Sequence, residues 1–173
     1  MRHKLSLATM AAIAVFPLGS AMAQVAESGY SLPLALAMKA ATKAIATCAS
    51  NGYPVSAAVV DTSGVIKLEA KGDHSTIGTM TSAYRKAYTV VTFGPIFRFD
   101  ASSTFAEIAA KNPAGAALAT LPDIALLPGG VAIKAKGEIV AALGVGGSPG
   151  GDKDEACARA GVESIKDELA SAQ

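Results

Sequence analysis

The first periodic segment of the chain has the spacing of an amphipathic helix. From Ser31 onward, apolar residues recur at alternating steps of four and three, while Lys39 and Lys43 lie off that stripe. The stripe consists of Leu34, Met38, Ala41, Ile45 and Cys48. We therefore expect a helix that Ser31 caps and that the Asn51-Gly52 pair ends.

After this helix the period of the pattern changes to two. Residues 55–61 (VSAAVVD) form a largely apolar run, and residues 65–71 (VIKLEAK) alternate apolar and charged side chains. Only the short segment TSG separates them. The pattern predicts a β-hairpin with one solvated face.

Helical spacing returns over residues 76–93, and the Gly94-Pro95 pair is expected to stop this second helix. Its apolar stripe contains Ile77, Met80, Tyr84, Ala87 or Tyr88, and Val91. Arg85 and Lys86 lie beside the stripe, where charged residues usually form the solvated shoulder of an amphipathic helix.

The last part of the chain predicts a short helix, three strands and a closing helix. The short helix covers residues 103–111, with Thr104 and Glu107 spaced as a capping box. The strands span residues 123–127, 131–135 and 138–145. Their links are as short as those of a meander, and the last strand is apolar on both faces, which places it near the centre of the sheet. The closing helix spans residues 152–171.

The order of these elements indicates the fold class. Helix, two strands, two helices, three strands and helix, joined by short hairpin links, predict a single α+β domain with a mainly antiparallel five-stranded sheet flanked by helices. A nucleotide-binding doubly wound fold is disfavoured, because it requires strands that alternate with helices.

The N-terminus has the composition of a secretory signal peptide. Arg2 and Lys4 precede an apolar run over residues 5–18, and small residues lead up to a cleavage site after Ala23. The run is short for an uncleaved membrane anchor, which is the alternative. We therefore expect a mature domain of residues 24–173, periplasmic or extracellular, with no membrane span after cleavage.

Cleavage also changes the charge and the histidine content. The full chain has a formal net charge of +1, and loss of residues 1–23 removes two basic residues and no acidic one. The remaining chain lacks the basic composition of nucleic-acid-binding proteins, so a nucleic-acid partner is not expected. His74 becomes the only histidine.

The two cysteines, Cys48 and Cys157, leave two interpretations open. In an oxidising compartment they can form a disulfide that closes a long loop. Both also fall on apolar helix faces, where a free cysteine is a common core residue.

A glycine-rich stretch, GVGGSPGGDKDEACARAG at residues 144–161, has the outline of a phosphate-binding loop. The carboxylates of Asp152, Asp154 and Glu155 would repel phosphate at the position where it should bind. One interpretation is a strand-to-helix connector in which Asp152 and Glu155 form a capping box. The other is a backbone that a ligand or a neighbouring chain can approach closely.

Three segments carry a family resemblance. AVVDTSG (58–64), SAYRKAYTVVTFG (82–94) and the stretch from LPGG to CARAG (127–161) resemble the GlcG/HbpS family of haem-binding proteins. The same domain is also found as the C-terminal part of PduO-type proteins. The match covers about residues 31–169.

The resemblance implies a profilin-like domain that assembles as a homo-oligomer, often an octamer. It implies haem as the cofactor, with storage, transport or redox sensing as roles and haem degradation in some members. A binding protein is favoured over an enzyme, and no serine-hydrolase or zinc pattern accompanies these residues. The alternative left open is a small-molecule-binding or protein-interaction module that forms a homo-oligomer without a haem role.

The residues expected to contact haem lie in and beside the second helix. Histidine, methionine, cysteine and tyrosine are the side chains that hold haem iron. His74, in the segment KGDHS, is the candidate iron ligand, and Met80, Tyr84 and Tyr88 are further candidates. Arg85 could pair with a haem propionate. The competing interpretation is that His74 is a solvated loop residue and that Met80 and the tyrosines pack in the core.

Overall fold

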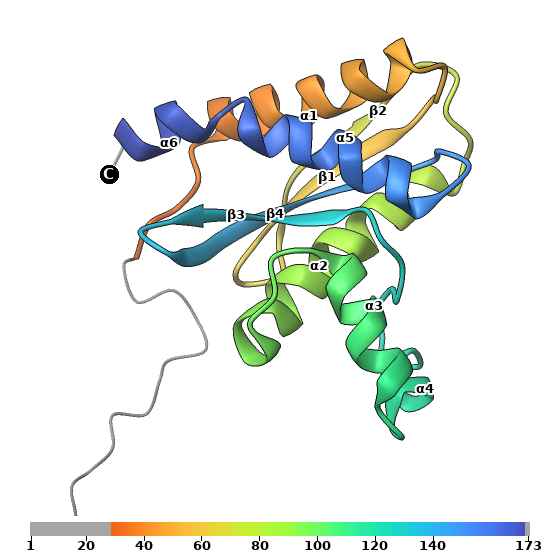
Figure 1. Ribbon diagram of the computed structural model, residues 1–173. Coiled ribbons are helices and arrows are strands. Elements are labelled where there is room, and N and C mark those ends of the chain that lie inside the picture. Colours follow the sequence, from red (N-terminus) through yellow and green to blue (C-terminus); the bar gives the residue numbers. More distant parts are fainter. Residues whose placement is uncertain (1–28, 172–173) are drawn as a thin grey trace, which may run out of the picture.

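Four strands form one antiparallel sheet within residues 29–171, the part of the chain that the computed structural model describes (Figure 1). The strands are β1 (Ser56–Asp61), β2 (Ile66–Lys71), β3 (Gly130–Ala135) and β4 (Glu138–Gly146), and their order in the sheet is β2-β1-β4-β3. The helices are α1 (Leu34–Ser50), α2 (Thr79–Phe97), α3 (Ser102–Lys111), α4 (Gly115–Leu118), α5 (Gly151–Glu163) and α6 (Lys166–Ser171). The segment predicted as a signal peptide lies outside the described residues. The α+β class and the central position of β4 are confirmed.

The sheet separates two layers of helices. In Figure 1, α1 and α5 lie on one face, and α2 crosses the other face with α3 beyond it. Alternation along β4 explains this arrangement, because Leu143 and Val145 pack toward α1 and α5 while Ala142 packs toward α2. Burial of a Leu or Val side chain of this kind contributes about 1.5–3 kcal/mol.

Small residues bring α2 into direct contact with β4. A Cβ atom on Gly144 would overlap the carbonyl oxygen of Ala83, and one on Gly146 would lie 2.8 Å from the carbonyl oxygen of Thr79. A side chain at either position would push the helix off the sheet. The glycines at the end of β4 therefore serve helix–sheet packing.

The hairpins at both ends of the sheet form as predicted, but the strand expected at residues 123–127 does not. β1 pairs with β2 and β3 pairs with β4, both antiparallel. Residues 123–127 contain no strand, and Asp123 has a left-handed backbone with φ 62°. The amide of Ala125 donates to Thr89 Oγ1 of α2 at 2.9 Å. This side-chain acceptor replaces a strand partner, so the sheet has four strands and not five.

Two helix ends differ from the prediction. Helix α2 continues through Pro95 to Phe97 and ends at Arg98, which is left-handed. Gly94 is buried inside this helix, and its carbonyl oxygen accepts a hydrogen bond from the amide of Phe99 at 3.2 Å. The predicted closing helix is divided into α5 and α6 by a turn in which the amide of Ile165 donates to the carbonyl oxygen of Val162.

The predicted N-caps at Ser31 and Thr104 are wrong. Helix α1 has Pro33 at its N-cap, α3 has Ala101, and neither has a side-chain capping bond. In α3, the Glu155 carboxylate from α5 accepts the amide of Ser103 at 3.2 Å. A tertiary contact thus satisfies a first-turn donor that a local cap would otherwise satisfy.

The apolar stripes are rotated relative to the expected ones. Leu34 and Met38 are exposed, whereas the buried face of α1 consists mainly of alanines. Ile77 lies before α2 and is 96% exposed. Small side chains bury readily where α1 packs tightly against α5, so alanine positions define the interior face of this helix.

Cys48 and Cys157 form a disulfide between α1 and α5, with their Cα atoms 5.6 Å apart. Both residues are buried. The free-cysteine interpretation is therefore wrong.

No helix within residues 29–171 combines the length and the apolar character that a membrane crossing requires.

Candidate functional site

The exposed side of α2 carries an aromatic and hydroxyl-bearing stripe. Tyr84, Tyr88, Thr92 and Ile96 are spaced by four residues and therefore follow one line along the helix. The rings of Tyr84 and Tyr88 are tilted by 47° with their centroids 5.6 Å apart. Both tyrosines are half-buried.

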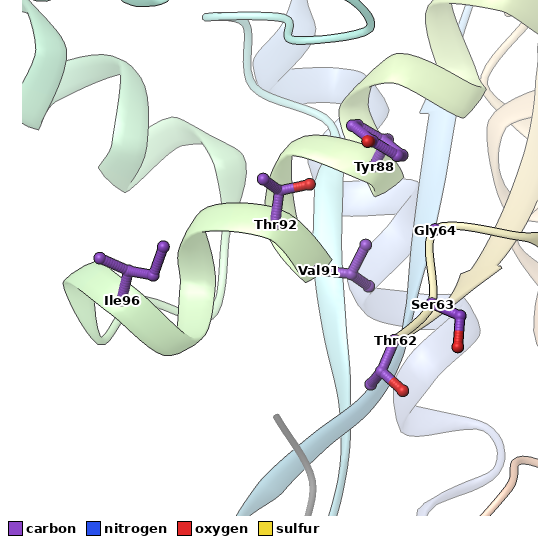
Figure 2. Close-up of a pocket in the computed structure, with 7 residues that line it drawn as sticks. All are labelled: Thr62, Ser63, Gly64, Tyr88, Val91, Thr92 and Ile96. Carbon is purple, nitrogen blue, oxygen red and sulfur yellow. The ribbon is translucent and has the colours of Figure 1, made fainter. Parts of the chain in front are cut away.

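This stripe borders an open cavity of about 250 Å³ between α2 and the turn that joins β1 to β2 (Figure 2). The lining residues are Thr62, Ser63 and Gly64 from the turn and Tyr88, Val91, Thr92 and Ile96 from α2. Of the five residues predicted to contact haem, only Tyr88 lines it.

Local hydrogen bonds and one glycine shape the turn. Asp61 Oδ1 accepts the amides of Ser63 at 2.9 Å and Val65 at 3.0 Å. Gly64 has φ +77°, and a Cβ atom there would lie 2.8 Å from Cε2 of Tyr88. Glycine is required at this position both for the backbone conformation and for contact with the tyrosine ring.

The cavity lining is uncharged and rich in hydroxyl groups. Thr62, Ser63, Tyr88 and Thr92 each bring a hydroxyl, and Val91 and Ile96 bring apolar surface. Within residues 29–171, none of these four hydroxyls bonds to another protein group. Thr89, one position along α2, instead donates its hydroxyl to the carbonyl oxygen of Arg85 at 2.8 Å. The cavity hydroxyls are thus free to bond a ligand.

The side chains of Tyr84 and Arg85 are directed to the loop before β3. Partial burial, followed by the nearby Asp123 carboxylate, raises the pKa of Tyr84. Arg85 donates from Nη2 to the carbonyl oxygen of Ile124 at 2.5 Å. Its Nε atom is buried and has no hydrogen-bond partner in the described part of the chain. Arg85 is therefore engaged at one nitrogen only.

His74 and Met80 lie at the other end of α2. His74 is exposed on the turn before the helix and has φ 61°, a left-handed conformation. The Ser75 hydroxyl stabilises this turn, because it donates to the carbonyl oxygen of Gly72 at 2.7 Å. It also lies 3.1 Å from the hydroxyl of Ser56. Ser56 is the first residue of β1, whereas the cavity lies beyond the last residue of this strand. The two ends of β1 are roughly 17 Å apart. The structure therefore groups Tyr84, Arg85 and Tyr88 and separates them from His74.

Lys86 is not a solvated shoulder residue. Its side chain is buried, and Nζ lies 2.6 Å from Oδ2 of Asp154. The other oxygen of Asp154 accepts the amide of Ser148 at 3.0 Å. Lys86 is thus committed to an internal ion pair beneath the glycine-rich loop and is not available to a ligand.

Asp154 and Glu155, after the glycine-rich loop, make tertiary contacts, and no side chain caps α5. The helix begins at Gly151 without a side-chain capping bond, so the predicted Asp152–Glu155 capping box is wrong. Glu155 accepts from Ser103 Oγ at 2.9 Å and pairs with Arg159 at 2.7 Å. The loop does connect β4 to α5, which agrees with the connector interpretation.

Sequence reasoning missed most of the cavity. The sequence pattern predicts residues 62–64 only as a turn and does not mark Thr92 or Ile96 as site residues. The four-residue spacing from Tyr84 to Ile96 was a detectable signal. The contribution of the turn had no such signal, because only the fold brings residues 62–64 beside the helix.

Comparisons with known proteins place the chain within a family. The model of a family described as "Haem degrading protein HbpS-like" matches residues 32–163. The chain belongs to the HbpS-like family. This confirms the resemblance seen in the sequence.

Solved structures of HbpS-like proteins share the fold. A double Glu-to-Asp mutant of HbpS from Streptomyces reticuli is 34% identical, with a TM-score of 0.72, and the match covers 88% of this chain and 98% of that one. A PduOC–haem complex is 18% identical, with a TM-score of 0.70 and coverage of 79% and 96%, and this likeness concerns the fold alone. A search of curated protein sequences gave no match.

Proposed function

We propose that this member of the HbpS-like family is a haem-binding protein with a role in haem storage, haem transport or redox sensing. Membership of the family over residues 32–163 carries the proposal. The family description names haem degradation, and a protein of the same fold has been solved in complex with haem.

The exposed face of α2 fits such a ligand in part. Tyr84 and Tyr88 offer adjacent rings to a planar molecule, and His74, Met80 and Tyr88 are side chains of the types that hold haem iron. Arg85, a half-buried cation next to Tyr84 on α2, is the proposed partner of a haem propionate. When bound, haem would supply the redox-active iron, and Tyr84, Arg85 and Tyr88, which the structure brings together, would position it.

The size of the cavity supports assembly into a homo-oligomer. Its volume of about 250 Å³ is below the roughly 300–1,000 Å³ that enclose a drug-sized ligand, and haem is at the large end of that class. One chain can therefore enclose only an edge of the macrocycle. We propose a homo-oligomer, often an octamer in proteins of this kind, in which a second copy covers the remainder.

Export is part of the same proposal. The buried Cys48–Cys157 disulfide supports it, because disulfides persist mainly in oxidising compartments. The N-terminal pattern of basic residues, an apolar run and small residues agrees with secretion to the periplasm or beyond.

Titration of residues 24–173 with ferric hemin tests the proposed function. We expect a saturable change in the Soret band, together with a hemin-dependent rise in thermal stability, because a ligand that binds only the folded state stabilises it. Tyr53→Phe, which alters a tyrosine remote from the α2 stripe in sequence, is the control variant. A linear, non-saturating titration of the wild type would contradict the proposal.

A small-molecule-binding module without a haem role is the second candidate. The uncharged, hydroxyl-lined cavity favours it, since such a lining suits a small neutral ligand better than an anionic one. Saturable hemin binding would speak against this alternative. Incubation of the hemin-loaded protein with a reductant and oxygen then distinguishes binding from degradation, because a stable Soret band indicates binding alone.

A further inference from the structure

We propose that a second copy of this chain docks on strand β2, edge to edge and antiparallel, around a two-fold axis that passes through the sheet at Ala70. The four-stranded sheets of the two copies then form one continuous sheet, and both α2 helices lie on the same face of it. This docking surface rests on the homo-oligomer of the proposed function and identifies where two copies meet.

The two edges of the sheet differ in how far they are covered. At the β3 edge, Ala101 forms a bridge with Val131, and the amide of Ala132 donates to the carbonyl oxygen of Asp100 at 2.8 Å. Strand β2, at the other edge, pairs with β1 alone among the strands of residues 29–171. An edge strand of this kind presents unpaired backbone groups to which another strand can bond. The β2 edge is therefore the place where a strand can be added.

The backbone of β2 is regular where the second copy would bind. The amide of Gly72 donates to the carbonyl oxygen of Val55 at 3.1 Å, so residues at every second position before Gly72 bond toward β1. The amides and carbonyl oxygens of Glu69 and Lys71, at the positions between, point away from β1. These are the groups that a strand from a second copy would meet.

The charges along β2 select the register of this contact. A two-fold antiparallel pair is centred on one residue, and side chains at equal distances from the centre face each other. A centre at Ala70 places Glu69 opposite Lys71 of the second copy, twice in each contact. A centre at Glu69 or Lys71 would oppose like charges. A centre at Leu68 would depend on Lys67, which is the extra residue of the β1–β2 bulge.

An exposed apolar line on α1 borders the same edge. Leu34 and Met38 are 53% and 52% exposed, and their helical spacing places them in line with Ile45. Ile45 reaches the end of β2, since its Cγ2 would lie 3.1 Å from a Cβ atom on Gly72. A copy docked at β2 brings its own α1 to this side of the molecule. The docking thus accounts for apolar side chains that their own chain leaves uncovered.

The second copy also completes the tyrosine surface of α2. Leu68 packs toward α1 and α5, so the Glu69 side chain points to the opposite face, where it interacts electrostatically with Tyr84. Gly64, in the turn that leads into β2, lies against the Tyr88 ring. Both tyrosines therefore lie on the β2 side of α2. Across the joined β2 strands, the tyrosines of two copies border one strip of sheet, of which a single chain provides half.

Sedimentation equilibrium of residues 24–173 measures the contact between copies, and charge reversal on β2 tests its register. Glu69→Lys and Lys71→Glu each turn both charge pairs into like pairs, so each should raise the dissociation constant of the dimer by about tenfold or more. An equimolar mixture of the two variants brings opposite charges together again and should restore assembly. Lys43→Glu is the matched control and should leave assembly unchanged, because Lys43 is exposed on α1 and, two positions from Ile45, faces a different side.

Hydrogen exchange provides a readout of the backbone. Exchange over residues 66–72 should be slower in the wild type than in Glu69→Lys at the same concentration, because assembly protects the outer amides of β2. Equal exchange in assembled wild type and dissociated variant would show that the copies meet elsewhere. Far-UV circular dichroism verifies that both reversals, which alter side chains at the sheet edge, remain folded.

The outcomes separate the docking surface from the proposed haem binding. A wild type that is monomeric at every concentration, a dissociation constant that neither reversal changes, or a mixture that stays dissociated overturns the docking surface. Hemin titration of the same samples is an independent readout. Saturable hemin binding by a monomer overturns the docking surface alone, whereas charge-dependent assembly without hemin binding supports the surface and overturns haem binding.

Discussion

Tyr84 and Tyr88 are separated by one helical turn, and their surroundings give them different chemistry. Tyr84 faces the loop that carries Asp123, with Glu69 of β2 also near enough to contribute to its raised pKa. Tyr88 faces an uncharged cavity. The identity of a residue alone, as read from the sequence, does not distinguish the two, because the difference comes from loops remote in sequence.

The raised pKa of Tyr84 predicts a pH-dependent stability. The folded protein holds the Tyr84 proton more tightly than the unfolded chain, whose tyrosines titrate near pH 10. The resulting stabilisation is fully present below about pH 10 and is lost as the pH rises through the folded value. We expect the free energy of unfolding to fall more steeply above about pH 10 in the wild type than in Tyr84→Phe. Urea titrations at several pH values measure both slopes, and parallel slopes would contradict the expectation.

At the scale of elements, the Lys86–Asp154 pair fastens α2 to the start of α5. Both side chains are almost fully buried, and their charged atoms lie 2.6 Å apart. The sequence could not reveal this pair, since 68 positions separate the partners and Lys86 follows Arg85 in what looks like a solvated charge cluster.

Removal of one partner of this buried pair should destabilise the fold strongly. Lys86→Met leaves the Asp154 carboxylate buried and unpaired, and we expect a loss of about 3–5 kcal/mol in the free energy of unfolding. Lys134→Met is the matched control, because Lys134 pairs with Asp100 at 3.1 Å in an exposed position. This substitution should lower the free energy of unfolding by less than about 1 kcal/mol. The double variant Lys86→Met/Asp154→Leu should recover most of the loss. Equal costs for the two single lysine variants in urea titrations would refute the prediction.

The periodicity of apolar residues predicts the four strands of the sheet. It gives wrong predictions where a side chain, and not the backbone, accepts a backbone hydrogen bond. The two hairpins followed from alternation and short turns. The segment 123–127 has a strand-like composition, yet Thr89 provides the acceptor for Ala125. Likewise, Glu155 binds the first turn of α3 in place of a local cap. In each case the deciding partner lies more than 30 positions away.

At the scale of the whole molecule, the disulfide and the candidate site lie on opposite faces of the sheet. Cys48 and Cys157 join α1 to α5, whereas Tyr84 and Tyr88 belong to α2 on the other face. The fold class and the family could be predicted from motifs in the sequence. The cavity could not, because the β1–β2 turn and α2 meet only in the folded chain.

Loss of the disulfide should therefore weaken the fold without altering the α2 face. Cys48→Ser/Cys157→Ser opens a link with a sequence separation of 109, and we expect the free energy of unfolding to fall by about 4 kcal/mol. The wild type, denatured without reductant, should show no reactive thiol. Near-UV circular dichroism of the folded double variant should retain the tyrosine signal. Two reactive thiols in the denatured wild type would show that the bridge is absent.

The contact between Gly144 and the backbone of Ala83 has a consequence for ligand recognition. With no side chain between strand and helix, α2 cannot slide or tilt without a direct steric clash. The placement of Tyr84, Tyr88, Thr92 and Ile96 against the sheet is therefore set before any ligand arrives, and their spacing follows from the helix itself. Binding at this face incurs little conformational entropy from the backbone, and it selects molecules whose own shape already matches that spacing.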